Sequence, residues 1–282
     1  MRTSNAWSEL VGFFTVPQGS PWIMRVAVPV TRIIRAIISR PTVVGIEKIP
    51  ATGPVIIAAN HTDYFDVVLM GLAVVEAGRM PIWVSADEYF SVPIFKSILK
   101  AVGTVPVYRS TGHAGDALVG MKHALENGGC LVVFPEGMMS VDPQKWPITG
   151  KTGVARLSKM VPNTTIVPAA HWGTERVLEP WSLKLNWRYL RSPSTVVFGE
   201  PIELGVTPDS THDEVKSATE RLMGAIEKLL VPLRRVNSLG YTTEPRELRW
   251  DKKRDGDPHT ATAGTQGLRE ELPDFEAPVP NA

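Results

Sequence analysis

Short runs of apolar, mostly β-branched residues alternate along the chain with longer stretches in which apolar residues recur with a helical period. This alternation predicts an α/β fold, a layered domain whose central, mostly parallel sheet is flanked by helices. Continuous apolar runs suit strands that are buried on both faces, and they occur at residues 42–46, 55–59, 82–85, 105–108, 131–134, 165–167 and 195–198. Crossover helices are predicted between them at residues 65–77, 91–102, 114–126 and 152–160.

A last long helix is expected to begin near Thr211, because Thr211 and Glu214 have the spacing of a capping box before an amphipathic run. Pro232 should bend or end this helix.

Residues 22–40 have a pattern of their own. At 100° per residue, isoleucines and valines gather on one side of a helix and Arg25, Arg32 and Arg35 gather on the other. A basic amphipathic helix of this kind is typical of a segment that lies in the membrane interface, with its arginines on anionic headgroups. The alternative is a helix whose apolar face docks on the protein's own core. Pro29 should kink the segment or divide it into two short helices.

Composition and charge narrow the function classes. Hydrophobic residues make up 43% of the 282 residues and charged residues 21%, which excludes disorder of the whole chain. A net charge of +1 argues against a dedicated nucleic-acid binder. Residues 1–40 carry five arginines and one acidic residue, whereas residues 243–282 carry nine acidic residues, six basic residues and five prolines. We therefore expect an N-terminal membrane-interface segment (1–40), an α/β domain (41–242) and a disordered tail (243–282).

The single cysteine, Cys130, offers no disulfide framework, so a reducing, cytoplasmic setting is expected. The longest stretches without a charged residue, 10–24 and 160–174, are fifteen residues each and are too short to span a bilayer. Glu9 stands where a secretory signal would need an apolar run. The protein is therefore expected to be peripheral or monotopic on the cytoplasmic face of the cell membrane.

Several familiar motifs are missing. Gly150-Lys151-Thr152 lacks the first glycine of a phosphate loop, and no G-x-S-x-G, G-x-G-x-x-G or H-E-x-x-H sequence occurs, so neither a nucleophile elbow nor a metal site is expected. What remains is the stretch from Asn60 to Asp66, directly after the apolar strand 55–59. If His61 lies on the turn before the helix, Asp66 can reach its ring, and the pair provides an imidazole base with an orienting carboxylate.

Three further stretches follow in order: 103–109 (GTVPVYR), 134–137 (FPEG) and 166–169 (IVPA). Together with the His61 stretch they resemble the four sequence blocks of the glycerolipid acyltransferase family, the relatives of lysophosphatidate acyltransferase, over roughly residues 40–205. The resemblance implies transfer of an acyl group from acyl-CoA or acyl carrier protein to a lyso-lipid hydroxyl, without a cofactor beyond the acyl donor. It also implies that His61 is the general base and Asp66 its partner, with Asp63 as the competing carboxylate.

The other blocks carry binding roles under the same resemblance. Arg109 takes the place of the phosphate-binding arginine, Glu136 and Gly137 match the block that contacts the acceptor, and Pro168 matches a block with a structural role in the wall of the acyl tunnel. Backbone N–H groups near the start of the helix after His61 are expected to serve as oxyanion donors.

The third block departs from the family pattern. Relatives that use lysophosphatidate continue Glu-Gly-Thr-Arg-Ser, whereas this chain has Met138 and Met139 before Ser140 and so lacks the second arginine. Lys145 or Lys151 can replace it at the phosphate, or the acceptor lacks a phosphomonoester. Lysophosphatidate (1-acyl-glycerol-3-phosphate) is the favoured acceptor, and a lysophospholipid or lyso-glycolipid is the alternative.

Two other classes stay open from the residues alone, an acyl-CoA thioesterase and a non-catalytic lipid-binding protein. The expected partners are the acyl donor, the lyso-lipid and an anionic membrane surface, and the oligomeric state is not encoded in the sequence.

Overall fold

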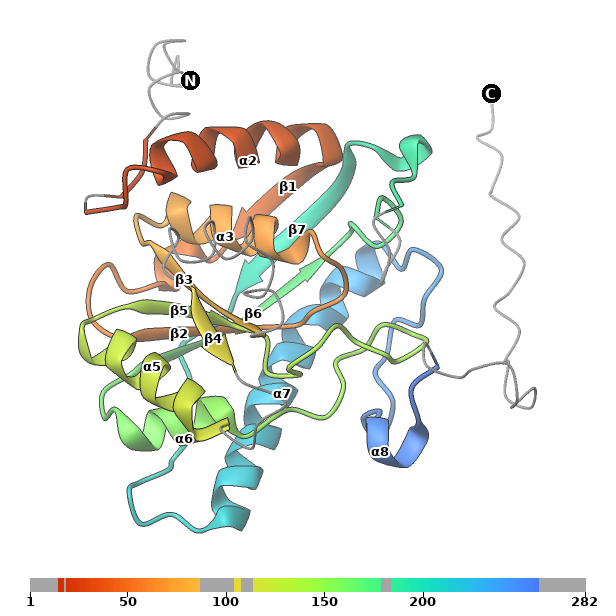
Figure 1. Ribbon diagram of the computed structural model, residues 1–282. Coiled ribbons are helices and arrows are strands. Elements are labelled where there is room, and N and C mark those ends of the chain that lie inside the picture. Colours follow the sequence, from red (N-terminus) through yellow and green to blue (C-terminus); the bar gives the residue numbers. More distant parts are fainter. Residues whose placement is uncertain (1–14, 18, 87–103, 108–113, 179–183, 259–282) are drawn as a thin grey trace.

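The computed structural model describes residues 15–17, 19–86, 104–107, 114–178 and 184–258 (Figure 1). Its centre is a seven-stranded sheet in the order β1-β7-β6-β2-β5-β3-β4, in which only the pairing of β6 with β7 is antiparallel. The strands are β1 Ser39–Val44, β2 Val55–Ala59, β3 Pro81–Ala86, β4 Val105–Val107, β5 Cys130–Val133, β6 Thr165–Trp172 and β7 Ser192–Phe198. The predicted α/β fold with a mostly parallel sheet is confirmed.

Helices cover both faces of the sheet. They are α2 Met24–Ile38, α3 Asp66–Glu76, α5 Ala114–Glu126, α6 Gly153–Met160, α7 His212–Val236 and α8 Lys252–Asp255, with short 3-10 turns η1 Ile46–Lys48 and η3 Trp187–Tyr189. Side chains of β2 alternate between the faces, so Ile56 packs with α5, α6 and α7 while Ile57 packs with α3. The predicted helix at 91–102 lies outside the described residues.

The start of α7 follows the predicted capping box. The Glu214 N–H donates to Thr211 Oγ1 at 3.3 Å, and the Thr211 N–H donates to Glu214 Oε2 at 2.6 Å. Pro232 lies inside α7 and does not end it, because the helix continues to Val236.

Helix α2 is one continuous helix with Pro29 inside it, so the expected division at that residue is not observed. It forms an outer layer on α3, where its Met24 and Val28 contact Leu72 and Val75 (Figure 1). Among the described residues no helix combines the length and the apolar character needed to cross a bilayer.

The two sides of α2 are oriented with the apolar side outward. Val26, Ile33 and Ile37 are 58%, 51% and 49% exposed, whereas Arg35 turns inward and pairs with Glu76 of α3 at 2.7 Å. The alternative of a helix docked on the protein's own core holds for Met24 and Val28, which pack on α3, whereas the isoleucine side of α2 stays exposed. The expectation that Arg35 faces headgroups is corrected, since its side chain is only 19% exposed.

The segment after α7 is ordered as far as the structure describes it. Arg249 forms a two-pronged ion pair with Glu227 of α7, at 2.6 and 2.8 Å, and the Trp250 carbonyl accepts from the Thr149 N–H at 2.9 Å. A disordered tail from Thr243 is therefore wrong for residues 243–258, because specific ion pairs outweigh the polar composition there. Residues 259–282 lie outside the described residues.

Candidate active site

The turn between β2 and α3 brings a histidine and an aspartate together. β2 is a buried central strand, and the chain leaves it at Asn60 and enters α3 at Asp66. His61 Nδ1 lies 2.9 Å from Asp66 Oδ2, and the His61 side chain is 16% exposed. His61 therefore sits on the turn and folds back on the first residue of the helix, as the spacing predicted.

Asp66 is the fixed member of this pair. Its buried Oδ2 also accepts the N–H groups of Thr62, at 2.6 Å, and Asp63, at 2.9 Å. Burial alone would raise the pKa of Asp66, but the imidazole of His171 and the hydrogen bonds from both histidines outweigh it and hold the pKa well below its usual range. These two N–H groups are thus already used, so the expectation that backbone groups at this helix start serve as oxyanion donors is not met by them.

Asp63, the competing carboxylate, faces another way. Its Oδ1 accepts the Phe65 N–H at 2.7 Å and its Oδ2 accepts the Thr174 hydroxyl at 2.9 Å. Burial raises the pKa of Asp63 well above its usual range, with the charges of Asp66 and Glu175 adding to the effect. The geometry assigns Asp66, not Asp63, as the partner of His61.

The third sequence block holds the His61 turn in place. The His61 ring stacks on Phe134 with a centroid distance of 4.1 Å, and the backbone N–H of His61 donates to Glu136 Oε1 at 2.9 Å. The other Glu136 oxygen accepts the Ile148 N–H at 3.0 Å, so both are engaged. Burial raises the pKa of Glu136 to about 8 against these two hydrogen bonds. This placement differs from the expected contact with the acceptor, because the side chain is only 1% exposed and serves the loop.

A second histidine, His171 at the end of β6, lies behind the pair and was missed in the sequence. Its Nε2 is 2.7 Å from the Asn60 carbonyl oxygen and 3.4 Å from Asp66 Oδ2, and its backbone exchanges two hydrogen bonds with the Asn60 side chain. Burial by itself would lower the pKa of His171, but Asp66 and neighbouring carboxylates raise it to about 9. No local sequence pattern could have located it, because its place depends on the pairing of β6 with β2 and on the hydrogen bonds that join residue 171 to residue 60.

The remaining candidates are spread around this turn. Gly137 adopts a φ of +72°, and a Cβ there would lie 3.3 Å from the Lys151 side chain, which is exposed. Lys145 is 7% exposed, and burial lowers its pKa against the attraction of nearby carboxylates. Pro168 lies within β6, and its carbonyl accepts the Gly199 N–H at 2.8 Å. Arg109 lies outside the described residues.

The methionines of the third block point into the protein to different extents. Met139, at the position of the family's missing arginine, is 5% exposed, and Met138 is half-buried. An apolar thioether thus fills the place where a cation would otherwise stand.

The chain resembles known proteins in its sequence and in its fold. A family model described as acyltransferase matches residues 40–172, which include His61, Asp66, Glu136 and His171. The crystal structure of the 1-acyl-sn-glycerophosphate (LPA) acyltransferase PlsC from Thermotoga maritima is similar, with a TM-score of 0.52 and 20% identity, over 78% of this chain and 86% of that chain. At this identity the likeness concerns the fold. No curated protein sequence matches the chain.

Proposed function

Because this chain belongs to the acyltransferase family, we propose that it transfers a fatty acyl chain from acyl-CoA or acyl carrier protein to the free hydroxyl of a lyso-glycerolipid. It is an O-acyltransferase. The observation that carries the finer proposal is the contact of 2.9 Å between His61 Nδ1 and Asp66 Oδ2 within the matched residues.

In the proposed mechanism His61 is the general base. With Nδ1–H donated to Asp66, Nε2 is left to accept the proton of the acceptor hydroxyl as its oxygen attacks the thioester carbonyl. The new ester C–O bond forms, the C–S bond breaks, and His61 returns the proton to the leaving thiolate. Asp66 supports both steps because it stays ionised and stabilises the imidazolium.

The favoured acceptor is 1-acyl-glycerol-3-phosphate. The similar solved structure is named for this substrate, and Lys151 lies exposed over Gly137 at the block that departs from the family pattern. Lys151 is better placed than the buried Lys145 to meet a phosphomonoester from solvent. A lysophospholipid or lyso-glycolipid acceptor is the second candidate, because Met139 removes a cation from the site.

We also propose that the enzyme works as a peripheral membrane protein. The outward side of α2 presents a continuous apolar stripe, which consists of Trp22, Val26, Val30, Ile33, Ile34 and Ile37. An apolar helix face of this size is suited to burial among headgroups and acyl chains, where both lipid substrates reside.

The test of the activity uses the purified protein in mixed micelles with palmitoyl-CoA and a panel of lyso-lipids, and follows both free CoA and the acylated product. The His61→Ala variant should lose at least a hundredfold of the rate, the range that a positioned base contributes. His123→Ala is the matched control, since His123 is exposed on α5. Equal rates for His61→Ala and the wild type would refute the assignment of the base.

The product pattern separates the rival functions. CoA release coupled to one acylated lipid supports acyl transfer. CoA release without a lipid product would mean a thioesterase, and binding of lyso-lipid without any release from either donor type would mean a lipid-binding protein.

A further inference from the structure

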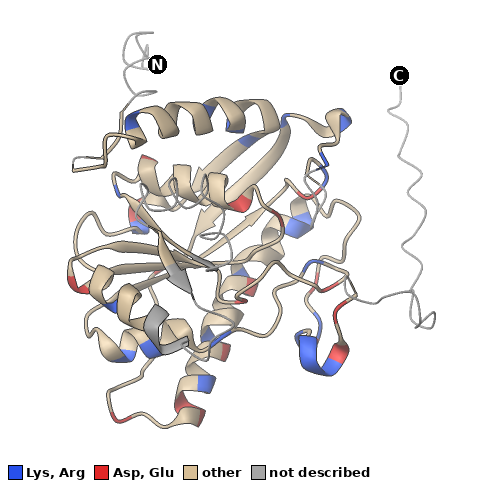
Figure 2. Ribbon diagram, in the orientation of Figure 1, with Lys and Arg blue, Asp and Glu red and all other residues tan. Residues whose placement is uncertain are grey.

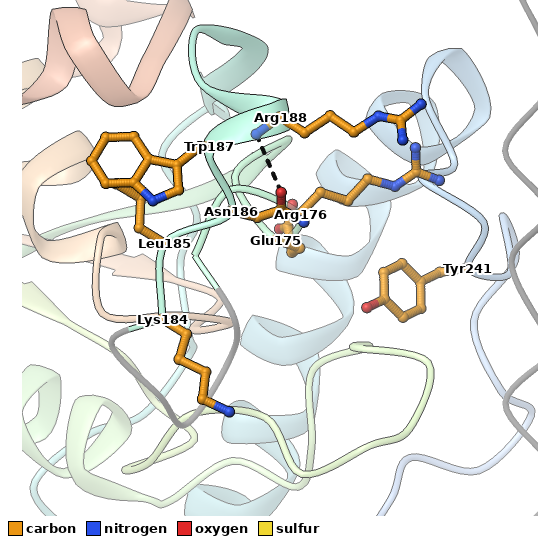
Figure 3. Close-up of a pocket in the computed structure, with 8 residues that line it drawn as sticks. All are labelled: Glu175, Arg176, Lys184, Leu185, Asn186, Trp187, Arg188 and Tyr241. Carbon is orange, nitrogen blue, oxygen red and sulfur yellow. Dashed lines mark hydrogen bonds between the residues drawn. The ribbon is translucent and has the colours of Figure 1, made fainter.

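A surface pocket of about 580 Å³ lies outside the turn of residues 60–66 that carries His61 and Asp66, here called the catalytic turn (Figure 3). The pocket plays no part in the proposed chemistry. Arg176, from the segment after β6, and Lys184 and Arg188, from the segment around η3, supply three cations to its lining. Trp187 and Tyr241 supply aromatic surface. The composition is that of a site for an anion attached to an apolar group.

The one carboxylate in the lining does not cancel this charge. Both oxygens of Glu175 are engaged on the inner side, where Oε1 accepts the Thr62 hydroxyl at 3.1 Å and Oε2 accepts the Gly173 N–H at 2.7 Å. The net formal charge of the lining stays positive. In Figure 3 the guanidinium groups of Arg176 and Arg188 point the same way, an arrangement that an anion between them would stabilise.

Neighbouring groups hold Arg176 on the side of the pocket where Tyr241 lies (Figure 3). Arg176 Nε donates to the Leu239 carbonyl at 3.2 Å, and its guanidinium lies 5.5 Å from the centre of the Tyr189 ring. Burial raises the pKa of Tyr241, so its hydroxyl keeps the proton that it can donate to an anion.

The η3 segment, which lines part of the pocket, lies next to the C-terminal end of α2. The backbone N–H of Arg191 donates to the Ile38 carbonyl at 2.8 Å, and its side chain donates to the Ala36 carbonyl at 3.2 Å, so the η3 segment is fastened to the end of α2. Trp187 of that segment is 74% exposed. Figure 2 shows basic residues on this segment and on α2, and no acidic residue on α2. Headgroup phosphates lie just above the depth at which an interfacial helix is buried.

We propose that the pocket formed by Arg176, Lys184, Arg188, Trp187 and Tyr241 binds the phosphate of an anionic phospholipid headgroup in the membrane on which α2 lies. The proposal rests on the membrane docking proposed above. It assigns headgroup recognition to the η3 segment in addition to Arg25, which is exposed on α2. Arg35 is turned toward Glu76, and Arg32 Nη1 donates to the Thr15 carbonyl at 3.3 Å. The bound lipid is distinct from the acceptor at His61 and fixes the orientation of the enzyme on the bilayer.

The test uses the full chain and vesicles of phosphatidylcholine, with and without phosphatidylglycerol. The double variant Lys184→Gln, Arg188→Gln removes two exposed cations from the pocket, and the control Lys216→Gln, Lys228→Gln removes two exposed cations from α7. The pocket variant should lose roughly tenfold or more of its affinity for the anionic vesicles, and the control less than twofold. Both variants should bind phosphatidylcholine vesicles as the wild type does, because α2 is unchanged.

A second arm tests for a defined site. Calorimetry with monomeric dihexanoylphosphatidylglycerol should give saturable binding to the wild type and to the control, and none to the pocket variant. An equal loss of affinity for anionic vesicles in the pocket variant and in the control would overturn the proposal, because it would mean that diffuse surface charge attracts the membrane. Weakened binding of free CoA by the pocket variant, with vesicle affinity unchanged, would overturn it in favour of the acyl donor. If the wild type binds neither kind of vesicle, the membrane docking itself fails.

Discussion

A single carboxylate oxygen, Asp66 Oδ2, organises the catalytic turn. It accepts from the ring of His61 and from two backbone N–H groups, and the ring of His171 approaches it to 3.4 Å. Only an ionised carboxylate can accept so many donors at once. Substitution of Asp66 would therefore disturb the base and the start of α3 together, which makes His171 the cleaner residue to test.

His171 should make the stability of the protein depend on pH. Its pKa is about 9 in the folded protein against an ordinary 6.5, so the folded state binds more protons between these values. Its contribution is complete below pH 6.5 and is lost as the pH rises through 9. Glu136, with a pKa of about 8, gives the same sign between its ordinary 4.5 and 8. Between pH 8 and pH 9 the decline is therefore assigned to His171, whereas above pH 9 the buried Cys130, whose pKa is raised to about 11, adds a decline of the same sign.

The measurement is urea unfolding of the wild type and of His171→Asn at steps from about pH 6 to about pH 10, a range that brackets the ordinary and the raised pKa of His171. The variant should be less stable at neutral pH, and its stability should change little between pH 8 and pH 9, where the stability of the wild type declines. His212→Asn, at an exposed histidine, is the control. A variant that declines between pH 8 and pH 9 as steeply as the wild type would show that His171 is not the titrating group.

We expect Lys151 to bind the phosphate of the acceptor. Since it is exposed beside Gly137, Lys151→Gln should raise the KM for lysophosphatidate roughly fivefold or more, the loss of one charged contact. The KM for lysophosphatidylcholine should change less than twofold, and Lys216→Gln should affect neither substrate. A parallel rise for both acceptors would mean that Lys151 shapes the loop and does not recognise the phosphate.

Among individual residues, the sequence predicts contacts between positions that lie close together along the chain. The His61–Asp66 contact follows from a spacing of five residues at the end of a buried strand. His171 stands 110 residues farther along the chain, and its place depends on the pairing of β6 with β2, which no local pattern contains.

Among the elements, α2 carries the membrane contact proposed above. Ile33→Glu combined with Ile37→Glu places two charges on its exposed stripe and should lower affinity for phosphatidylcholine vesicles at least tenfold, because each charge would have to enter the apolar layer. The melting temperature should stay within about 2 °C of the wild type, since both side chains are about half exposed.

Val119→Glu is the matched control for these variants. Val119 is a valine on α5, 62% exposed, on the opposite face of the sheet from α2, so this change should leave vesicle binding as it is. Retained binding by the α2 variant would show that another surface holds the membrane.

The composition of each side of α2 could be predicted from helical periodicity, but its orientation could not. Which side turns inward is decided by Glu76 of α3, which pairs with Arg35, and by Leu72 and Val75, which receive Met24 and Val28. These partners belong to a different helix, so periodicity within residues 22–40 carries no information about them.

For the whole molecule, the segment after α7 acts as a strap across the domain. Arg249 joins it to Glu227 and Glu220 of α7, and the Trp250 carbonyl joins it to Thr149, next to the Ile148 N–H that binds Glu136. The strap thus stabilises the loop of Ile148 and Thr149, which is hydrogen-bonded to Glu136.

Arg249→Ala should therefore lower the melting temperature by roughly 2–8 °C, because it breaks charged hydrogen bonds that are mostly shielded from solvent. Lys253→Ala, an exposed change on α8, should shift it by less than about 1 °C. Calorimetric melting curves give both values. Equal melting temperatures for Arg249→Ala and the wild type would mean that the strap is not coupled to the core.

The global architecture was the most predictable level, because buried parallel strands leave continuous apolar runs that alternate with crossover helices. The strap was not predictable, since polar composition describes an ordered segment held by ion pairs and an unstructured one equally well. Only the partners of Arg249 on α7 distinguish the two.

The outward isoleucines of α2 also determine how the protein behaves away from lipid. In detergent-free solution no acyl chains cover the stripe, and exposed apolar patches of this kind drive molecules together. Light scattering should therefore rise with protein concentration, and short-chain detergent should reverse it. Oligomers that form under those conditions would reflect contacts between the exposed apolar stripes of α2 on different molecules.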